Sequence, residues 1–273
     1  MMTAIIVAPN GAYKTKRDHV AIPMTLAEMC AEARQYADLG AAMVHVHVRD
    51  SAGEHTLDLP LCQHWANELQ RTVGQDILVQ LTTEAAGKYG AEEIAHFIAH
   101  IEAPAISVAI SELFVEQHDT ERGAEALQKA ASRGTLIQYI VYSVADLKRY
   151  HALLAAGTLP HCPHHVLVVL GKYSEGKQAS PDELTSFLRL PMPNSWAVCA
   201  FGDDELACLD RAIAYGGDVR IGFENNLLDE DGLVASSNVA QLKALKSVAK
   251  KRQVCIHNAS EYFTFLKTKA LAS

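Results

Sequence analysis

The 273-residue sequence has no long apolar run, no Cys-x-x-Cys pair and no excess of basic residues. No segment stays apolar over the roughly 20 residues that a membrane-spanning helix needs, so we expect no such helix. A formal net charge of −8 at pH 7 argues against nucleic acid or an anionic membrane as a general partner. The cysteines are scattered, so we expect free thiols in a reducing compartment; they are Cys30, Cys62, Cys162, Cys199, Cys208 and Cys255.

The N-terminal stretch MMTAIIVAPNGAYKTKRD also lacks the features of a secretory leader. Its apolar run is short, and no basic region precedes that run. The rest of the chain shows no low-complexity tract, no linker and no domain-sized shift in composition. We therefore expect a cytoplasmic protein that forms a single domain over residues 1–273.

What the sequence does contain is a regular alternation of short β-branched runs and longer amphipathic ones, repeating about every 30 residues. This rhythm is typical of βα units. Eight pairs with nearly continuous apolar strands favour an α/β fold of the closed (β/α)8 TIM-barrel type, with an open doubly wound sheet as the alternative. The expected strands cover residues 4–8, 42–48, 76–81, 105–110, 135–142, 165–170, 195–201 and 218–223.

Three helix starts can be predicted, two of them from capping residues. TLAE at 25–28 has the pattern of a capping box. SPDE at 180–183 places Pro181 at the first helical position. The helix after the last strand is expected to run from near Ser236 to about Lys251.

The stretch MVHVHVRD at 43–50 places two histidines one residue apart within a run of valines. Because side chains alternate along a strand, His45 and His47 project to one face, with their roots about 7 Å apart. Two neutral imidazoles can converge from that spacing on one metal ion, which they would bind at about 2.0–2.1 Å. The alternative is a pair of core histidines hydrogen-bonded to the backbone or to a carboxylate.

Polar residues gather where the expected strands end, which is where TIM barrels carry their sites. Glu224, after the eighth strand, is the obvious third ligand. Two imidazoles and a carboxylate form a catalytic zinc-type site with open positions, although an iron(II) facial triad uses the same ligands. In the alternative reading, Glu224 is a rim carboxylate paired with Arg49 or Arg220. Arg220 lies four residues before Glu224 on the same strand face and could also bind a substrate carboxylate.

Several motifs together resemble the β-keto acid cleavage enzyme family: APNGA, PMTLAE, GAAMVHVHVRDSAG, TTEAAG, VLGKYSEG, and DVRIGFENNL followed by ASSNVAQ. The match extends in order over nearly the whole chain. The resemblance implies a (β/α)8 barrel, a Zn²⁺ ion held by His45, His47 and Glu224, and a homo-oligomer, either dimer or tetramer. It also implies a Claisen-type exchange in which a β-keto acid and acetyl-CoA give acetoacetate and a new acyl-CoA.

The resemblance also suggests roles for individual residues. A hydroxyl at Thr82 or Thr83 would bind substrate, and Arg220 would assist a neighbouring acid in proton transfer. Together with the residues at the strand ends, this gives two sets of candidates. The catalytic positions are Arg220, Asn225, Thr82 and Gln138, and the substrate-binding positions are Thr83, Asn10, Arg49 and Gly171.

The departures from the family pattern affect mainly the acid–base groups. Asn225 stands where the family has the aspartate assigned to proton abstraction, and an amide cannot act as that base. Gln138 replaces a glutamate, Tyr13 follows GA in place of an acid, and Ala109 or Ile110 occupies an expected hydroxyl position. A general base contributes about 10²–10⁴-fold, so exchange by the family route should be slow unless another group takes over.

Three hypotheses remain open. The protein performs the exchange with another base, for which the candidates by position are Glu84, Glu112, Glu116 and His118. Alternatively, the same metal supports an enolate, aldol or hydrolytic reaction on a different oxo acid. In the third hypothesis, the protein is a non-catalytic metal-binding barrel that binds a keto acid or a CoA ester.

Overall fold

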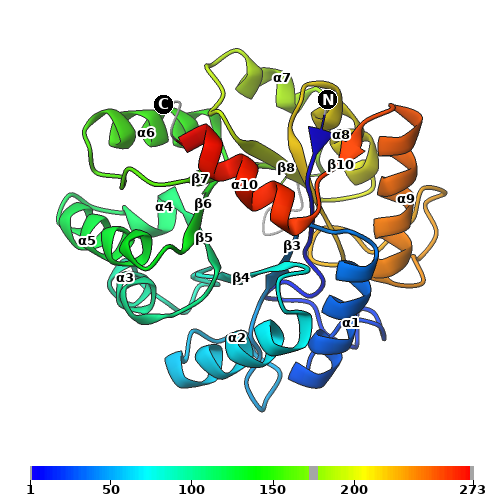
Figure 1. Ribbon diagram of the computed structural model, residues 1–273, viewed down its shortest axis with the longest axis horizontal. Helices are drawn as coiled ribbons and strands as arrows, with labels where there is room; N and C mark the ends of the chain where they lie inside the picture. The colour runs from blue at the N-terminus through cyan, green and yellow to red at the C-terminus, as the bar shows by residue number, and fades with distance from the viewer. Residues whose placement is uncertain (1, 172–177, 271–273) are drawn as a thin grey trace.

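A computed structural model describes residues 2–171 and 178–270 of the chain. Eight parallel strands form a closed barrel in which neighbours in sequence are neighbours in space, and β9 closes the circle by pairing with β2 (Figure 1). The predicted TIM barrel is confirmed, and closure excludes the open doubly wound sheet. The strands are β2 (Ile5–Val7), β3 (Met43–Val46), β4 (Leu78–Thr82), β5 (Ala105–Ala109), β6 (Leu136–Val141), β7 (His164–Leu170), β8 (Trp196–Ala200) and β9 (Asp218–Ile221).

All the described helices except the last surround the barrel on its outside (Figure 1). They follow the strands in the alternation expected from the sequence. The bounds of the described helices are α1 (Leu26–Asp38), α2 (Leu59–Val73), α3 (Ala91–His100), α4 (Ile110–Leu113), α5 (Asp119–Ser132), α6 (Val144–Ala155), α7 (Glu183–Leu188), α8 (Glu205–Ala214), α9 (Asn238–Lys251) and α10 (Ala259–Ala270).

The predicted helix starts are confirmed in two of three cases. Thr25 and Glu28 form a reciprocal capping box before α1. The helix after the last strand begins at Asn238, with Ser237 as its cap. At SPDE, however, the prediction of Pro181 as the first helical residue is wrong, because residues 181–182 form a turn and α7 begins at Glu183.

Side chains of the strands divide between two cores. In β3, Val44 and Val46 face outward and pack in the core between the barrel and its helices. Met43, on the opposite face, belongs to a second core that fills the inside of the barrel together with residues such as Ile6 and Leu167. This alternation directs His45 and then His47 to the inside of the barrel, as the sequence pattern predicted.

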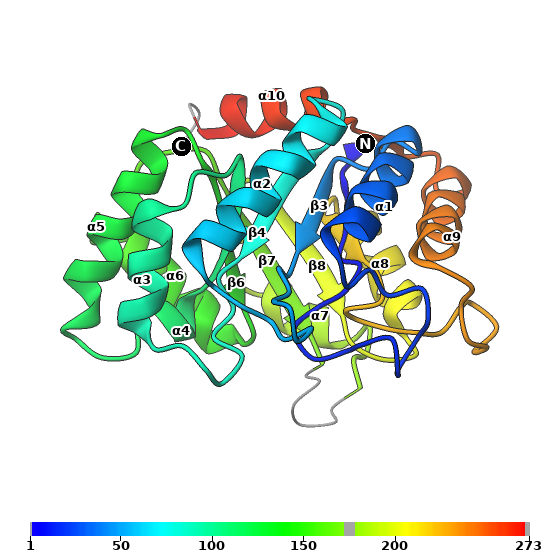
Figure 2. The same ribbon diagram turned by 90° about the horizontal axis from the view of Figure 1, so that it is seen from below.

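The two ends of the barrel differ. At the end where the strands begin, α10 lies across the opening, beside a small parallel sheet of β1 (Met2–Thr3) and β10 (Cys255–Ile256) (Figure 2). Tyr262 and Leu266 of α10 are almost completely buried and pack in the inner core. The sequence reading did not identify this closing helix. Because α10 covers that end, only the end where the strands stop is left for a site formed by loops.

None of the helices in the two described ranges has both the length and the apolar composition needed to span a bilayer.

Candidate metal centre and its cavity

A cavity of about 560 Å³ opens at the ends of the barrel strands. Residues from all eight barrel strands or from the segments that follow them contribute to its wall, so residues distant in sequence meet around one space. Of the predicted site residues, those in the wall are Asn10, His45, Thr82, Gly171, Arg220 and Glu224. Six further residues of the family motif VLGKYSEG and its flank, 172–177, lie outside the described residues.

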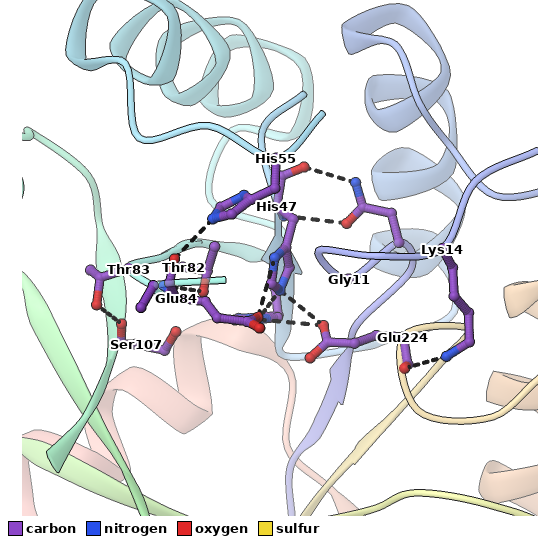
Figure 3. A network of polar contacts seen from close by, with 12 residues as sticks. Gly11, Lys14, His47, His55, Thr82, Thr83, Glu84, Ser107 and Glu224 are labelled. Atoms are coloured by element: carbon purple, nitrogen blue, oxygen red, sulfur yellow. Dashed lines mark hydrogen bonds and ion pairs between the residues drawn. The ribbon is translucent and has the colours of Figure 1, made fainter. Parts of the chain in front are cut away.

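His45, His47 and Glu224 converge beside this cavity; Figure 3 shows His47 and Glu224 pointing toward each other. One donor atom from each lies within 4.8 Å of the other two. Glu224 Oε2 is 3.5 Å from His45 Nε2 and 3.3 Å from His47 Nε2, and the two Nε2 atoms are 3.1 Å apart. Four such ligands at about 2.0–2.1 Å from a tetrahedral ion lie about 3.3 Å from one another, so this triangle of donors has the size that a divalent metal requires.

The protonation states also suit a metal. Burial lowers the pKa of His45 to about 4 and that of His47 to about 3, which keeps both imidazoles neutral at pH 7. Burial opposes ionisation of Glu224, but the Arg220 guanidinium and then the two imidazoles hold the pKa of this carboxyl well below its usual range. The three residues therefore offer two nitrogen lone pairs and a carboxylate, and they fit a divalent ion.

Arg220 is the ion-pair partner of Glu224. Its Nη2 lies 2.9 Å from Glu224 Oε1, and the same nitrogen donates to Cys199 Sγ at 3.2 Å. Arg220 therefore holds one carboxylate oxygen while the other faces the imidazoles. The alternative partner considered from the sequence, Arg49, does not take this role.

Backbone turns place the Glu224 side chain over the end of the barrel. Gly222 has a φ of +145°, and a Cβ atom there would lie only 2.3 Å from the carbonyl oxygen of Ala8. Lys14 Nζ donates to the backbone oxygen of Glu224 at 2.7 Å. The chain is thus fixed on both sides of the carboxylate ligand.

Gly11 leaves the space that the Glu224 side chain occupies. Its φ is +63°, and an added Cβ would lie 2.8 Å from Glu224 Cγ. We expect Gly11→Ala to displace the carboxylate and to lower the affinity for a divalent ion such as zinc about 10-fold or more, comparable to the loss of an outer-sphere partner. Chelator competition measures this affinity, with Gly40→Ala as the control because its φ of +76° is similar and nothing lies within 4 Å. Equal zinc affinity in the two variants would contradict the steric argument.

Besides His47, four predicted residues do not line the cavity. Arg49 donates to the backbone oxygens of Gly11, Lys14 and Gly53, so it fixes loops and does not face the space for substrate. The Thr83 hydroxyl donates to the backbone oxygen of Ser107 at 2.9 Å. The other two are Asn225 and Gln138.

Asn225 and Gln138 have different surroundings. Asn225 is 3% exposed, and neither polar atom of its side chain has a hydrogen-bond partner among the described residues. Gln138 lies fully buried inside the barrel and contacts Gln80 and His165. The amides that replace family acids are therefore both outside the cavity wall.

Of the four alternative bases, only the two glutamates nearest the strand ends line the cavity: Glu84 and Glu112. Glu116 and His118 have side chains exposed by 70% and 66% and contact each other on the surface. Glu112 Oε2 accepts a hydrogen bond from the backbone N–H of Ala85 at 3.1 Å, which gives it a structural partner.

Glu84 lies beside the metal centre (Figure 3). Its Oε2 is 3.7 Å from His47 Nδ1, and it is hydrogen-bonded to Tyr13. Burial, followed by the charges of Glu224 and Glu112, raises the pKa of Glu84 to about 8. Glu84 is thus the one candidate base that combines a place in the cavity wall with contact to a proposed ligand.

Two residues of the site, His55 and Ser107, were not among those predicted from the sequence. The His55 ring lies 5.1 Å from the His47 ring, and its Nε2 contacts the backbone oxygen of Glu84 at 3.0 Å (Figure 3). No motif pointed to His55. Ser107 supplies a hydroxyl to the cavity from β5, two residues before the position where Ala109 had suggested its loss. Period-two alternation along the strand could have identified Ser107.

The chain is thus a TIM barrel in which two imidazoles and a carboxylate that could hold a metal ion lie beside a cavity at the strand ends. The sequence profile described as beta-keto acid cleavage enzyme matches residues 3–267. The chain belongs to the beta-keto acid cleavage enzyme family.

Characterised relatives match over nearly their full length. The chain is 26% identical to the 3-keto-5-aminohexanoate cleavage enzyme of Acetoanaerobium sticklandii, covering 90% of this chain and 91% of the relative. It is 23% identical to the 3,5-dioxohexanoate:acetyl-CoA acetone transferase of Paraburkholderia graminis, covering 98% and 96%. Among solved structures, the binary complex of ObcA with oxaloacetate superimposes with a TM-score of 0.71 at 13% identity, covering 90% of this chain and 67% of that one. This last likeness supports the fold.

Proposed function

We propose that the protein is a zinc-dependent acyl-exchange enzyme that acts on a β-keto acid and acetyl-CoA. The observation that carries this proposal is the triangle of His45, His47 and Glu224 donors at the wall of a cavity in a chain of this family. The names of the relatives add support, since one of them is a transferase that uses acetyl-CoA.

The exchange moves the acyl group of the keto acid to coenzyme A. The bond between the methylene carbon and the ketone carbon of the β-keto acid breaks, and the methylene carbon forms a bond to the acetyl carbon of acetyl-CoA. The freed acyl group joins the thiol sulfur. The products are acetoacetate and a new acyl-CoA, so atoms balance without an oxidant or a reductant.

The charges around the centre are complementary to a keto acid. Arg220 neutralises Glu224, so a bound divalent cation leaves the wall of the cavity positively charged. The carboxylate of a β-keto acid supplies the opposite charge. When bound, the zinc ion would polarise the ketone and so acidify the neighbouring methylene group.

The residues of the chain then hold the substrate and move its proton. Burial and the charge of Glu224 raise the pKa of Glu84, and a divalent cation bound beside it would lower that pKa and favour the ionised carboxylate. Glu84 is therefore our candidate to take the proton from the methylene carbon, in place of the missing acid at position 225. The Ser107 hydroxyl lines the cavity and has no hydrogen-bond partner among the described residues, so it can donate to a substrate oxygen. Thr82 also lines the cavity, and its hydroxyl accepts from the backbone N–H of Glu84 at 3.1 Å, which fixes the segment that carries the base.

The test mixes zinc-loaded protein, a panel of β-keto acids and acetyl-CoA carrying ¹³C in its acetyl group. We expect the label to appear in the acetyl half of acetoacetate, together with one unlabelled acyl-CoA whose mass identifies the preferred keto acid. Mass spectrometry detects both products, and His45→Ala provides the control without the centre.

The same experiment separates the two other hypotheses. Exchange of the substrate methylene protons with deuterated water, without acyl transfer, would replace our proposal by enolate chemistry on another acceptor. Tight keto acid binding in calorimetry without proton exchange or turnover would indicate a binding protein. Labelled acetoacetate at the level of the His45→Ala control contradicts the exchange proposal.

A further inference from the structure

A row of buried polar side chains runs through the inside of the barrel, from the metal centre to the end where the strands begin. His45 Nδ1 lies 2.7 Å from Gln80 Oε1, and Gln80 Nε2 donates to Gln138 Oε1 at 3.3 Å. Gln138 Nε2 lies 2.7 Å from His165 Nδ1, and His165 Nε2 lies 3.2 Å from Asp218 Oδ2. Each of the five residues is at most 6% exposed, so water does not compete for these contacts.

The donors in this row all point the same way. An ionised Asp218 only accepts hydrogen bonds, so His165 donates through Nε2 and, when neutral, accepts through Nδ1. Gln138 donates its amide hydrogen to that nitrogen and accepts from Gln80 with its oxygen. Gln80 in turn directs its oxygen at His45, so the single ring hydrogen of His45 lies on Nδ1.

We propose that this row, the polar relay Gln80–Gln138–His165–Asp218, fixes the tautomer of His45 and thereby presents a bare Nε2 to the metal. Nε2 is the atom that lies 3.5 Å from Glu224 Oε2. The relay residues are positioning residues, since none of them lines the cavity. The inference rests on the metal centre of the proposed function.

The composition of the barrel interior indicates that Gln80 and Gln138 do more than fill space. Apolar residues of the inner core, such as Leu136, Leu167 and Val169, occupy neighbouring positions. Burying an amide without partners costs free energy, so two glutamines in this core require each other and the two histidines. Because each member satisfies the next, the orientation imposed at Asp218 is transmitted to His45.

Asp218→Asn tests the relay with an almost identical shape. The backbone N–H of Ala4 donates to Asp218 Oδ1 at 2.6 Å, so the carbonyl oxygen of the new amide is held there and its NH2 group faces His165. His165 must then accept through Nε2 and donate through Nδ1. The side-chain amides of both glutamines rotate by about 180° in response. The hydrogen of His45 then moves to Nε2, where it prevents this nitrogen from binding the metal.

A second substitution should reverse this effect. In Asp218→Asn combined with Gln138→Glu, the new carboxylate accepts from His165 Nδ1 and from Gln80 Nε2, so Gln80 again directs its oxygen at His45. In Gln138→Glu alone, a protonated His165 donates to both carboxylates and the His45 tautomer is retained. A residue that only fills space does not produce this pattern of loss and rescue.

The tautomer is read in metal-free protein by long-range ¹H–¹⁵N NMR of ¹⁵N-labelled histidine, and zinc affinity is read separately by chelator competition. We expect Asp218→Asn to move the His45 hydrogen to Nε2 and to weaken zinc binding by about 10–100-fold, with both properties restored in the double variant. An unchanged His45 tautomer in folded Asp218→Asn overturns the relay. This readout needs no substrate, so it stands apart from failure of the exchange reaction.

Gln80→Met provides a second variant that leaves the far end of the barrel intact. It removes the acceptor from His45 Nδ1, so we expect the ring to populate both tautomers and zinc affinity to fall about 10-fold. If Asp218→Asn does not fold, this variant decides the question. A single Nδ1–H tautomer in Gln80→Met contradicts the proposal.

Discussion

Replacing Glu84 with glutamine should lower kcat for acyl exchange by about 10²–10⁴-fold, the contribution of a positioned general base. The substitution keeps the size of the side chain and its place in the cavity wall, but removes the carboxylate that would take the methylene proton. Zinc content and KM should change little, because Glu84 contacts His47 only at 3.7 Å and the ligand triangle remains.

The measurement combines steady-state kinetics with exchange of the substrate methylene protons into deuterated water. Glu84→Gln should lose proton exchange to the same degree as kcat, because both depend on the same base. Glu116→Gln is the matched control: it is the same chemical change at a side chain 70% exposed and outside the cavity. A kcat of Glu84→Gln within about threefold of the unmodified protein would assign proton abstraction to another group.

The parts of the site that lie on strands could be predicted from the sequence. Alternation along MVHVHV places both imidazoles inside the barrel, and closure of eight strands brings the segment of Glu224 to them. The period of a strand is a local property of the chain, so a short window is sufficient to assign faces. The same reasoning applied to DILVQLT would have placed Gln80 on the inner face, because it lies two residues before Thr82 on the same strand.

The parts that depend on loops could not be predicted in this way. Glu84, Glu112 and Glu116 are equally plausible bases in the sequence, because each follows a strand. The structure separates them through long-range contacts, such as the hydrogen bond of Glu84 with Tyr13. Arg49 was expected to bind substrate, but its guanidinium is used by backbone oxygens of the neighbouring loops. The hydrogen-bond acceptors of a buried guanidinium such as that of Arg49 depend on the folded structure and cannot be read from the local sequence.

Removing the Glu224 carboxylate should eliminate both metal binding and activity. In Glu224→Gln, one of the three donors becomes a neutral amide, which binds zinc poorly, and Arg220 loses the partner that lies 2.9 Å from it. An uncompensated guanidinium beside the centre also repels a cation. We therefore expect zinc to be absent from the purified variant.

Activity should fall with the metal. Polarisation of the ketone by zinc contributes several kcal/mol, and each 1.36 kcal/mol corresponds to a factor of ten, so exchange should decrease about 10³-fold or more. Elemental analysis measures the zinc, and the ¹³C acetyl-CoA assay measures the activity.

The control for this experiment addresses adventitious zinc on the surface. His96 and His100 lie one turn apart on α3 and are both exposed, with ring centroids 4.3 Å apart. Such a pair can retain zinc unrelated to catalysis, so His96→Ala/His100→Ala should keep one zinc ion per chain and full activity. Glu224→Gln in that background should contain none. The opposite outcome is that zinc is lost with His96 and His100 while activity survives Glu224→Gln. The site at the strand ends would then not be the catalytic one, because a ligand set that can be removed without loss of turnover does not polarise the substrate.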